Sequence, residues 1–298
     1  MICVESLIKK FDNKTVLDEI SLEINDGLVY GLLGSNGSGK STLLRSIAGI
    51  YEPDGGAIMT DDKAVFENAD YKNQIFLVSD EPFFFAQSSV NEMAAFYRKF
   101  YSNWDEEVFR RLCGVFPLNY SAKISTFSKG MKRQALIILS ISTSPKYLLL
   151  DEAFDGLDPV MRNVLKSIIA EKIVDNAMSV VVSSHNINEF ENMCDVIAIL
   201  HKGKKILERN QNDQSDQITK VQIAFNGPPA REMFGSFNVH HYESRGNLAT
   251  LTIRGERDEV ESGLQAMNPI FMDIIPATLE EIFLYEMEGV GYDPKNIL

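Results

Sequence analysis

Cysteine is scarce in this chain of 298 residues. The three present, Cys3, Cys113 and Cys194, lie far apart, form no CxxC pair and leave one over if two were joined. This pattern excludes a disulfide framework, and it lacks the paired cysteines that are typical of a zinc site. We therefore expect a reducing, cytoplasmic environment.

Long hydrophobic runs are missing as well. The most apolar stretches, 78–86 and 135–141, fall far short of the ~20 residues that a membrane-spanning helix needs. The opening residues 1–12 reach charge at Glu5 and contain neither an apolar core nor a small-residue cleavage site. The sequence therefore predicts neither a membrane span nor a signal peptide.

Positive charge is in deficit, with 29 Lys and Arg against 42 Asp and Glu and a formal net charge of −13. Affinity for nucleic acid comes mainly from Lys and Arg on phosphates, so we expect no nucleic acid partner. Hydrophobic residues make up 45% and charged residues 24%, which is typical of a folded protein. At about 150 residues per domain, the length predicts roughly two domains.

The first two thirds of the chain alternate between strand and helix patterns. Residues 4–24 predict two strands joined by a turn at 12–14. Short apolar runs predict buried strands at 27–33, 75–79, 147–150, 180–183 and 196–200. Such strands, separated by helices, are typical of a parallel sheet covered on both faces. Helical spacing of apolar residues predicts a helical insertion at about 84–144.

A second unit follows a polar stretch at 210–217, which we interpret as a linker. Residues 218–298 are then predicted to form a small α+β domain. Its elements are a strand at 220–225, a helix near 231–234, strands at 237–242 and 248–254, a helix at 257–267 and a strand at 270–275. This βαββαβ order is that of a ferredoxin-like fold. Thr278 and Glu281 form a capping box that predicts a closing helix.

The strongest functional signal is a glycine-rich loop between the strand at 27–33 and a helix. It comprises Gly34, Ser35, Asn36, Gly37, Ser38, Gly39, Lys40, Ser41 and Thr42, and matches the P-loop pattern. Glycines let successive N–H groups turn toward phosphate oxygens, and the helix N-terminus adds favourable partial charge. Lys40 is predicted to reach the β- and γ-phosphates and Ser41 to bind Mg²⁺. The loop therefore predicts binding of a nucleotide, with ATP and Mg²⁺ as the expected ligands.

Two acids follow the strand at 147–150. Open α/β sheets bind ligands at the carboxyl ends of their strands, which is where Asp151 and Glu152 stand. Asp151 suits a water-mediated contact to Mg²⁺, and Glu152 can orient or deprotonate an attacking water. In the absence of a P-loop, helix capping would be the better interpretation of these acids.

With these motifs in order, residues 1–209 resemble the ATP-binding subunit of a bacterial ABC transporter. The resemblance implies an α/β P-loop ATPase domain with an antiparallel β part and a helical insertion. The family signature, LSGGQ, corresponds to 127–131, where Ser128 and Gly130 match while Lys129 and Met131 do not. In the family this helix N-terminus faces the γ-phosphate bound by the other protomer. Capping of the helix that follows is the structural alternative for Ser128.

Three further residues match family positions. The resemblance implies that Phe11 stacks on adenine, although a core aromatic at a strand end is an equal alternative. Asp158, in the sequence Asp-Gly-Leu-Asp-Pro, matches the loop that helps to position the partner protomer's site, and a turn with helix capping is its alternative. His185 matches the family's switch histidine, which contacts the γ-phosphate and holds the catalytic acid, here Glu152.

One position departs from the family. After the strand at 75–79 the family carries Gln, whereas this chain has Asp80. An ionised Asp only accepts hydrogen bonds and brings negative charge near the γ-phosphate, a charge that Mg²⁺ would offset. Asp80 is therefore expected either as a ligand on the Mg²⁺ side or as a neighbour of the site without a direct role.

The resemblance also implies an assembly. Two copies, or one copy and a related ATPase, close around two ATP molecules and drive an integral membrane permease subunit on a separate chain. This permease would dock near 83–85, where three Phe follow one another, although these rings would equally fill the core beneath the insertion. The protein would then lie in the cytoplasm, peripheral on the inner face of the cell membrane. The C-terminal extension resembles that of exporter subunits.

Two other classes of function are alternatives. A soluble ABC-type ATPase would act without a membrane partner, but it usually carries tandem cassettes or a long coiled coil, and neither is evident here. An unrelated P-loop kinase or GTPase conflicts with the signature helix, the Asp158 loop and His185. The expected activity is ATP hydrolysis coupled to transport, with Glu152, His185 and Lys40 as its catalytic residues.

Overall fold

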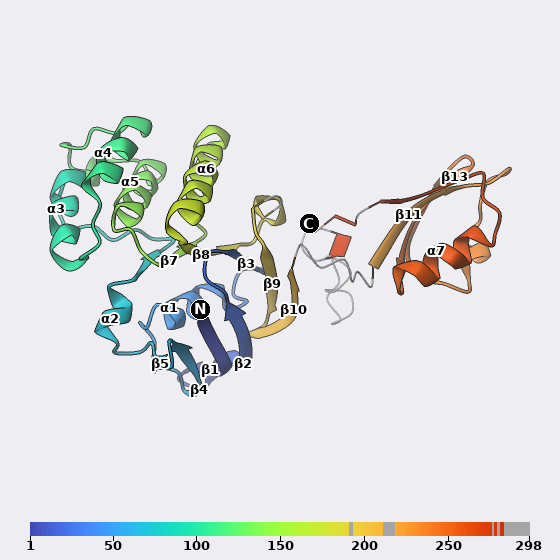
Figure 1. The fold of residues 1–298 in the computed structure, drawn as a ribbon, viewed down its shortest axis with the longest axis horizontal. Helices are drawn as coiled ribbons and strands as arrows, with labels where there is room; N and C mark the ends of the chain where they lie inside the picture. The colour runs from blue at the N-terminus through green and yellow to red at the C-terminus, as the bar shows by residue number, and fades with distance from the viewer. Residues whose placement is uncertain (191–192, 211–217, 276, 279–280, 283–298) are drawn as a thin grey trace. The chain divides into compact units, whose positions relative to one another are not determined.

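The computed structural model describes residues 1–190, 193–210, 218–275, 277–278 and 281–282. By internal contacts the chain divides into two units, Met1–Asn210 and Gln211–Leu298 (Figure 1). Of the linker predicted at 210–217, residues 211–217 lie outside the described part of the chain. Each unit is described below by itself.

The first unit opens with an antiparallel sheet. Its strands are β1 (Ile2–Phe11), β2 (Lys14–Ile24), β4 (Gly55–Thr60) and β5 (Lys63–Ala64). They lie in the order β2-β1-β4-β5, and a turn at Asp12, where φ is 53°, joins β1 to β2. The hairpin predicted for residues 4–24 is confirmed, whereas β4 and β5 were not predicted.

A second, six-stranded sheet carries the candidate site. Its strands are β3 (Val29–Leu33), β6 (Ile75–Val78), β7 (Tyr147–Asp151), β8 (Ser179–Ser184), β9 (Val196–His201) and β10 (Lys204–Asn210). The order is β10-β9-β3-β8-β7-β6, with all neighbours parallel except β10, which returns antiparallel to β9. The predicted buried strands are confirmed. Because five of the strands are parallel, their carboxyl ends meet at one edge.

Helix α1 (Lys40–Ile47) lies between the two sheets. It contacts β2 of the first sheet and β7 and β8 of the second. Leu43, Leu44 and Ile47 are fully buried there and join one hydrophobic core with residues of both sheets. The core thereby fixes the helix N-terminus, and the loop before it, at the carboxyl edge of β3.

The helical insertion stands apart from the antiparallel sheet. In Figure 1, α3 (Val90–Phe100), α4 (Glu106–Val115) and α5 (Lys129–Ser142) gather together, with a 3₁₀ turn, η1 (Ile124–Thr126), before α5. Elsewhere in this unit lie α2 (Ala69–Lys72), α6 (Pro159–Asn176) and the 3₁₀ turn η2 (Ile187–Glu189). The helix α6 was not predicted. Ser89 and Glu92 form a capping box that explains why α3 begins where it does.

The second unit forms a four-stranded antiparallel sheet. Its elements are β11 (Ile218–Ala224), η3 (Arg231–Phe234), β12 (Asn238–Arg245), β13 (Leu248–Arg254), α7 (Arg257–Gln265) and β14 (Phe271–Ile275). The strand order is β12-β13-β11-β14. The predicted succession of elements is confirmed, with a 3₁₀ turn as its first helical element. Thr278 and Glu281 make both bonds of the capping box, and the helix expected beyond 282 lies outside the described residues.

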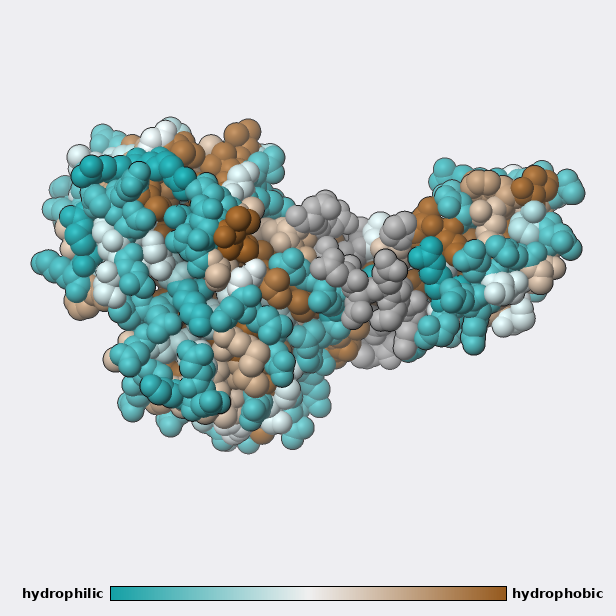
Figure 2. Space-filling view, in the orientation of Figure 1, coloured by the Kyte–Doolittle hydropathy of each residue, from teal (hydrophilic) through white to brown (hydrophobic). Residues whose placement is uncertain are grey.

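The apolar residues are mostly inside. On the face drawn in Figure 2 the first unit is largely hydrophilic, with hydrophobic residues in small separate patches. Within the part of the chain that the structure describes, no helix combines the length and apolar character needed to cross a bilayer.

Replacing Leu149 by Ala tests the packing of the central sheet. Leu149 lies in β7 and is fully buried in the core between the sheets. Its loss leaves a cavity and should lower the free energy of unfolding by about 2–5 kcal/mol in urea denaturation. Val174→Ala on the exposed side of α6 is the control, and it should change this energy by less than about 0.5 kcal/mol. Equal effects of the two changes would contradict this account of the core.

Candidate active site

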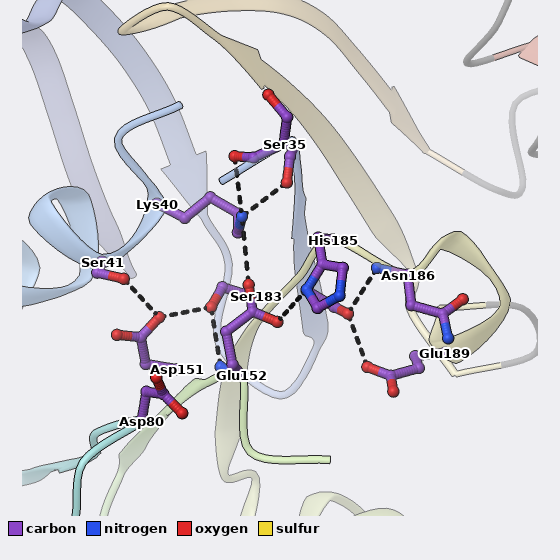
Figure 3. A network of polar contacts seen from close by, with 12 residues as sticks. Ser35, Lys40, Ser41, Asp80, Asp151, Glu152, Ser183, His185, Asn186 and Glu189 are labelled. Carbon is purple, nitrogen blue, oxygen red and sulfur yellow. Dashed lines mark hydrogen bonds and ion pairs between the residues drawn. The ribbon is translucent and has the colours of Figure 1, made fainter. Parts of the chain in front are cut away.

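The chemistry-bearing residues meet at the carboxyl edge of the six-stranded sheet. The glycine-rich loop follows β3, Asp151 is the last residue of β7 with Glu152 directly after it, and His185 follows β8. Figure 3 shows these side chains turned toward one another from separate elements. Motifs spread between Gly34 and His185 in the sequence thus form one cluster.

Lys40 lies at the centre of this cluster, although it is a charged residue at only 4% exposure. Its ammonium donates to the carbonyls of Gly34 (2.6 Å) and Ser35 (3.3 Å). It also lies 3.2 Å from Glu152 Oε1. Burial of an ammonium is unfavourable unless it is paired and hydrogen-bonded, and these three contacts meet that demand.

The glycine loop fits an anionic ligand. Gly39, the N-cap of α1, has φ of 110°, a conformation that favours glycine, and it lets the loop close over the helix start. The Ser38 hydroxyl is buried and has no hydrogen-bond partner among the described residues. Together with the helix N-terminus and Lys40, these donors suit phosphate oxygens.

Asp151 is fixed by two hydroxyls. Its Oδ1 accepts hydrogen bonds from Ser41 (3.0 Å) and Ser183 (2.8 Å), and its side chain is buried. A hydroxyl and a carboxylate side by side are oxygen donors of the kind that Mg²⁺ prefers. The structure therefore brings together two of the predicted metal ligands, Ser41 and Asp151.

Glu152 joins two of the predicted catalytic residues. One carboxylate oxygen faces Lys40, and the other lies 3.0 Å from Nδ1 of His185. The Glu152 side chain is 13% exposed while His185 is 46% exposed, so the imidazole forms the solvent side of the pair. Donor atoms of Glu152, Asp155 and His185 lie within 4.8 Å of one another, but an imidazole is a poor ligand for Mg²⁺.

Phe11 lies at the end of β1 and is 40% exposed, so it does not fill the core. Its ring meets the edge of Tyr51, with centroids 5.2 Å apart, and the Lys9 ammonium lies 5.5 Å from its centroid. Lys9 and the backbone N–H of Lys10 both bind Asp54. The N–H of Lys10 and the Lys9 ammonium hold the pKa of this carboxyl below its ordinary value. The strand end that presents Phe11 is thereby anchored.

The signature helix begins at the surface. Ser128 caps α5 by accepting a hydrogen bond from the N–H of Met131 (3.2 Å), as the structural alternative predicts. A Cβ on Gly130 would lie 2.9 Å from the carbonyl oxygen of Gly156, so the close approach of these two loops requires glycine. Asp158 likewise caps α6, through the N–H of Met161 (3.0 Å). Both residues therefore cap helices within this chain, and their contacts with a second copy stay predictions.

Asp80 has different neighbours from those expected of a metal ligand. Its Oδ1 lies 2.6 Å from Nη2 of Arg133 and 3.9 Å from the Lys129 ammonium, both on α5. The carboxylate is therefore neutralised by the signature helix, whereas Ser41 and Asp151 bind each other. In this structure Asp80 is thus the partner of Arg133, and its role as a ligand on the Mg²⁺ side stays a prediction.

Sequence reasoning missed two residues that hold the site. The Ser183 hydroxyl donates a hydrogen bond to Asp151 and accepts one from the backbone N–H of Glu152 (3.2 Å). Arg133 is fully buried beneath Asp80 and Glu152. A signal existed for Arg133, because a charged residue stands among the apolar positions of a helix. The contact partners, however, are far away in sequence.

Comparisons with known proteins agree with this geometry. A family model described as ABC transporter matches residues 17–155. The chain is 27% identical to the ABC transporter ATP-binding protein YtrB of Bacillus subtilis (strain 168), over 97% of this chain and 99% of the relative. It is 31% identical to the linearmycin resistance ATP-binding protein LnrL of the same organism, over 76% of each. A solved ATP-binding subunit of an ABC transporter gives a TM-score of 0.66 at 27% identity, covering 72% of this chain and 91% of that one.

Lys40→Ala tests the glycine loop as the phosphate site. Removing a buried ammonium that is placed for phosphate oxygens should weaken ATP binding about 10- to 100-fold, as measured by fluorescent-nucleotide titration. Lys63→Ala, a change of the same kind at an exposed position in β5, is the control and should leave the affinity unchanged. Full retention of ATP affinity by the Lys40 variant would mean that the loop does not bind the phosphates.

Proposed function

The chain belongs to the ABC transporter family of ATP-binding proteins, and on that premise we propose that two copies close around two ATP molecules and hydrolyse them to drive export by a separate membrane protein. The observation that carries this proposal is the position of Glu152, between Lys40 and His185 and next in sequence to Asp151, which binds Ser41. These are the groups that phosphoryl transfer to water requires.

ATP binding begins with an exchange of partners at Lys40. The ammonium now pairs with the Glu152 carboxylate, and phosphate oxygens would compete for the same charge. Mg²⁺, held by Ser41 and through water by Asp151, would neutralise negative charge on the phosphates. The adenine ring would stack on Phe11, which is 40% exposed at the end of β1.

Hydrolysis then falls to Glu152. Once Lys40 has turned to the phosphates, the carboxylate is free to accept a proton from a water molecule as the water oxygen attacks the γ-phosphorus. The bond between that phosphorus and the ADP oxygen breaks, and ADP leaves with the electron pair. His185, 3.0 Å from Glu152, keeps the carboxylate in place from the solvent side.

The second copy supplies the other half of the site. Ser128 and Lys129 at the N-terminus of α5 are exposed, and the N–H groups there and the Ser128 hydroxyl suit an incoming γ-phosphate. Asp158 lies at the start of α6, at the end of a loop whose Gly156 packs against Gly130. The Asp158 loop and the start of the signature helix are therefore neighbours, and both would face the partner. Loss of the γ-phosphate removes the link between the copies and lets them separate. A related ATPase in place of the second copy is the alternative.

Glu152→Gln tests both the catalytic role and the assembly. An amide cannot accept the proton but retains the shape, so ATP should still bind, turnover should fall by about 100-fold or more, and a dimer should accumulate with ATP. Glu107→Gln on the exposed side of α4 is the matched control. Size-exclusion chromatography with ATP and Mg²⁺ reads the outcome, and a variant that stays monomeric would contradict the two-copy site.

The membrane partner is proposed to dock on an aromatic surface of the helical insertion. Phe83 and Phe100 are exposed by 72% and 63%, and Phe85 by 45%. Successive ring contacts join Phe83 to Phe85, Phe85 to Phe96 and Phe96 to Phe100. We call these four residues the aromatic surface. The exposure argues against the alternative that residues 83–85 fill the core.

A cavity of about 400 Å³ adjoins this surface. It is lined by Ile50, Lys72, Phe83, Tyr97, Tyr101 and Leu136, among others. Exposed apolar patches of this kind mark interaction sites. A short segment of a membrane protein, inserted here, would place this chain on the inner face of the membrane.

Export is the direction that we propose. The linearmycin resistance relative, at 31% identity, supports it, because a transporter can give resistance to a toxic compound by carrying it out of the cell. A soluble ATPase without a membrane partner is the competing function, and it predicts association with ribosomes or DNA in place of a membrane protein.

Phe83→Ser separates these two functions. When the tagged chain is purified from detergent-solubilised membranes of the cells that naturally make it, the loss of this ring should reduce the co-purified membrane protein about 10-fold. Val174→Ser, which removes another exposed apolar side chain, on α6, should leave the yield unchanged. No recovery of the membrane protein with the wild type would favour the soluble alternative.

A further inference from the structure

A fully buried arginine lies beside the proposed catalytic acid. Arg133, on the signature helix α5, has 0% exposure. Its Nη1 donates to the backbone carbonyl of Glu152. Its Nη2 donates to the carbonyl (2.5 Å) and to Oδ1 (2.6 Å) of Asp80. The planar fork of a guanidinium directs its donors to two neighbours in a fixed geometry, which a flexible lysine ammonium does not reproduce.

The backbone of Glu152 explains why this contact matters. Glu152 has φ of 49°, in the left-handed region that residues other than glycine rarely adopt. Such a conformation persists only where the surrounding structure holds it. The Glu152 N–H is bound by Ser183 on β8, and the Glu152 carbonyl is bound by Arg133. The direction in which the carboxylate leaves the backbone, toward Lys40 and His185, therefore depends on Arg133.

Asp80 supplies the counter-charge. It is 47% exposed, and it follows β6 in the segment that leads to Phe83. A buried guanidinium without an acid nearby would be costly, and Asp80 is the carboxylate that the structure places against it. Pairing with Arg133 thus gives a physical reason for an aspartate at the position where the family carries glutamine.

We propose that Arg133 is a positioning residue for ATP hydrolysis: with Asp80 as its counter-ion, it holds Glu152 in its left-handed conformation and ties it to the segment before the aromatic surface. This inference rests on the proposed function, in which Glu152 activates water. One side chain then connects the proposed docking surface with the catalytic acid. A shift of residues 79–85 on docking would reach Glu152 through Asp80 and Arg133.

The test compares kcat and KM for ATP in the full chain. Arg133→Lys keeps the charge but loses the fork, and a misplaced Glu152 should lower kcat about 10- to 100-fold while KM changes less than about 3-fold. A purely structural defect would lower the melting temperature and the fraction of active protein without this division between kcat and KM. Arg110→Lys, the same change at a position of α4 that is 78% exposed, is the control and should match the wild type.

Asp80→Asn is the second variant. Asp80 is 47% exposed, and Asn keeps its size and an oxygen that can accept a hydrogen bond from Arg133. The melting temperature of this variant is measured first, so that kcat is compared between folded proteins, and the variant tests the proposal even if Arg133→Lys does not fold. We expect kcat to fall about 3- to 10-fold at unchanged KM, since the guanidinium loses its counter-ion. In the double variant the two losses should not multiply, because both residues act through the same contact with Glu152.

The outcomes are distinguishable from failure of the proposed function. A wild type that does not hydrolyse ATP would refute that function itself. A wild type that hydrolyses ATP, with kcat unchanged in folded Arg133→Lys or in Asp80→Asn, would overturn only the positioning role. Losses that multiply in the double variant would show that the two residues act separately and would also overturn it.

Discussion

The ion pair between the Lys40 ammonium and the Glu152 carboxylate is the contact on which the site depends. It joins the start of α1 to the end of β7, and both groups are largely buried. Removing one partner of a buried pair leaves an uncompensated charge at a cost of about 3–5 kcal/mol, so the two stay together until another anion replaces the carboxylate. A triphosphate is such an anion. Nucleotide binding and release of the catalytic acid are then one event in the proposed mechanism.

The geometry of this pair follows from the order of the parallel strands. Lys40 follows β3 and Glu152 follows β7, with β8 between them, and β8 brings Ser183 and His185 to the same edge. A different functional group follows each of these strands, and the hydrogen bonds across the sheet fix the spacing between the strand ends. The antiparallel sheet contributes Phe11 and packs against the other face of α1. The fold thus positions the site through backbone register.

Sequence reasoning reached the parts of the molecule whose chemistry is local. A few adjacent residues are enough to recognise the loop from Gly34 to Thr42 and the acids after an apolar strand. The structure places the two motifs together. The strand β4 was missed because it opens with two glycines and its apolar residues are adjacent in sequence instead of alternating with polar ones. For Asp80 the sequence left two roles open, a ligand on the Mg²⁺ side or a neighbour of the site, because its charge was visible but its partner, 53 residues further on, was not. Contacts between distant segments need the fold.

The central claim is that a triphosphate is bound by the glycine loop of one copy and the signature helix of another. The most direct measurement is a crystal structure with Mg²⁺ and a non-hydrolysable ATP analogue. We predict that Ser128 of one copy lies within hydrogen-bond distance of the γ-phosphate bound at Lys40 of the other, with Lys40 on the phosphates and no longer on Glu152. A nucleotide bound by one copy alone, with Ser128 facing solvent, would contradict the account.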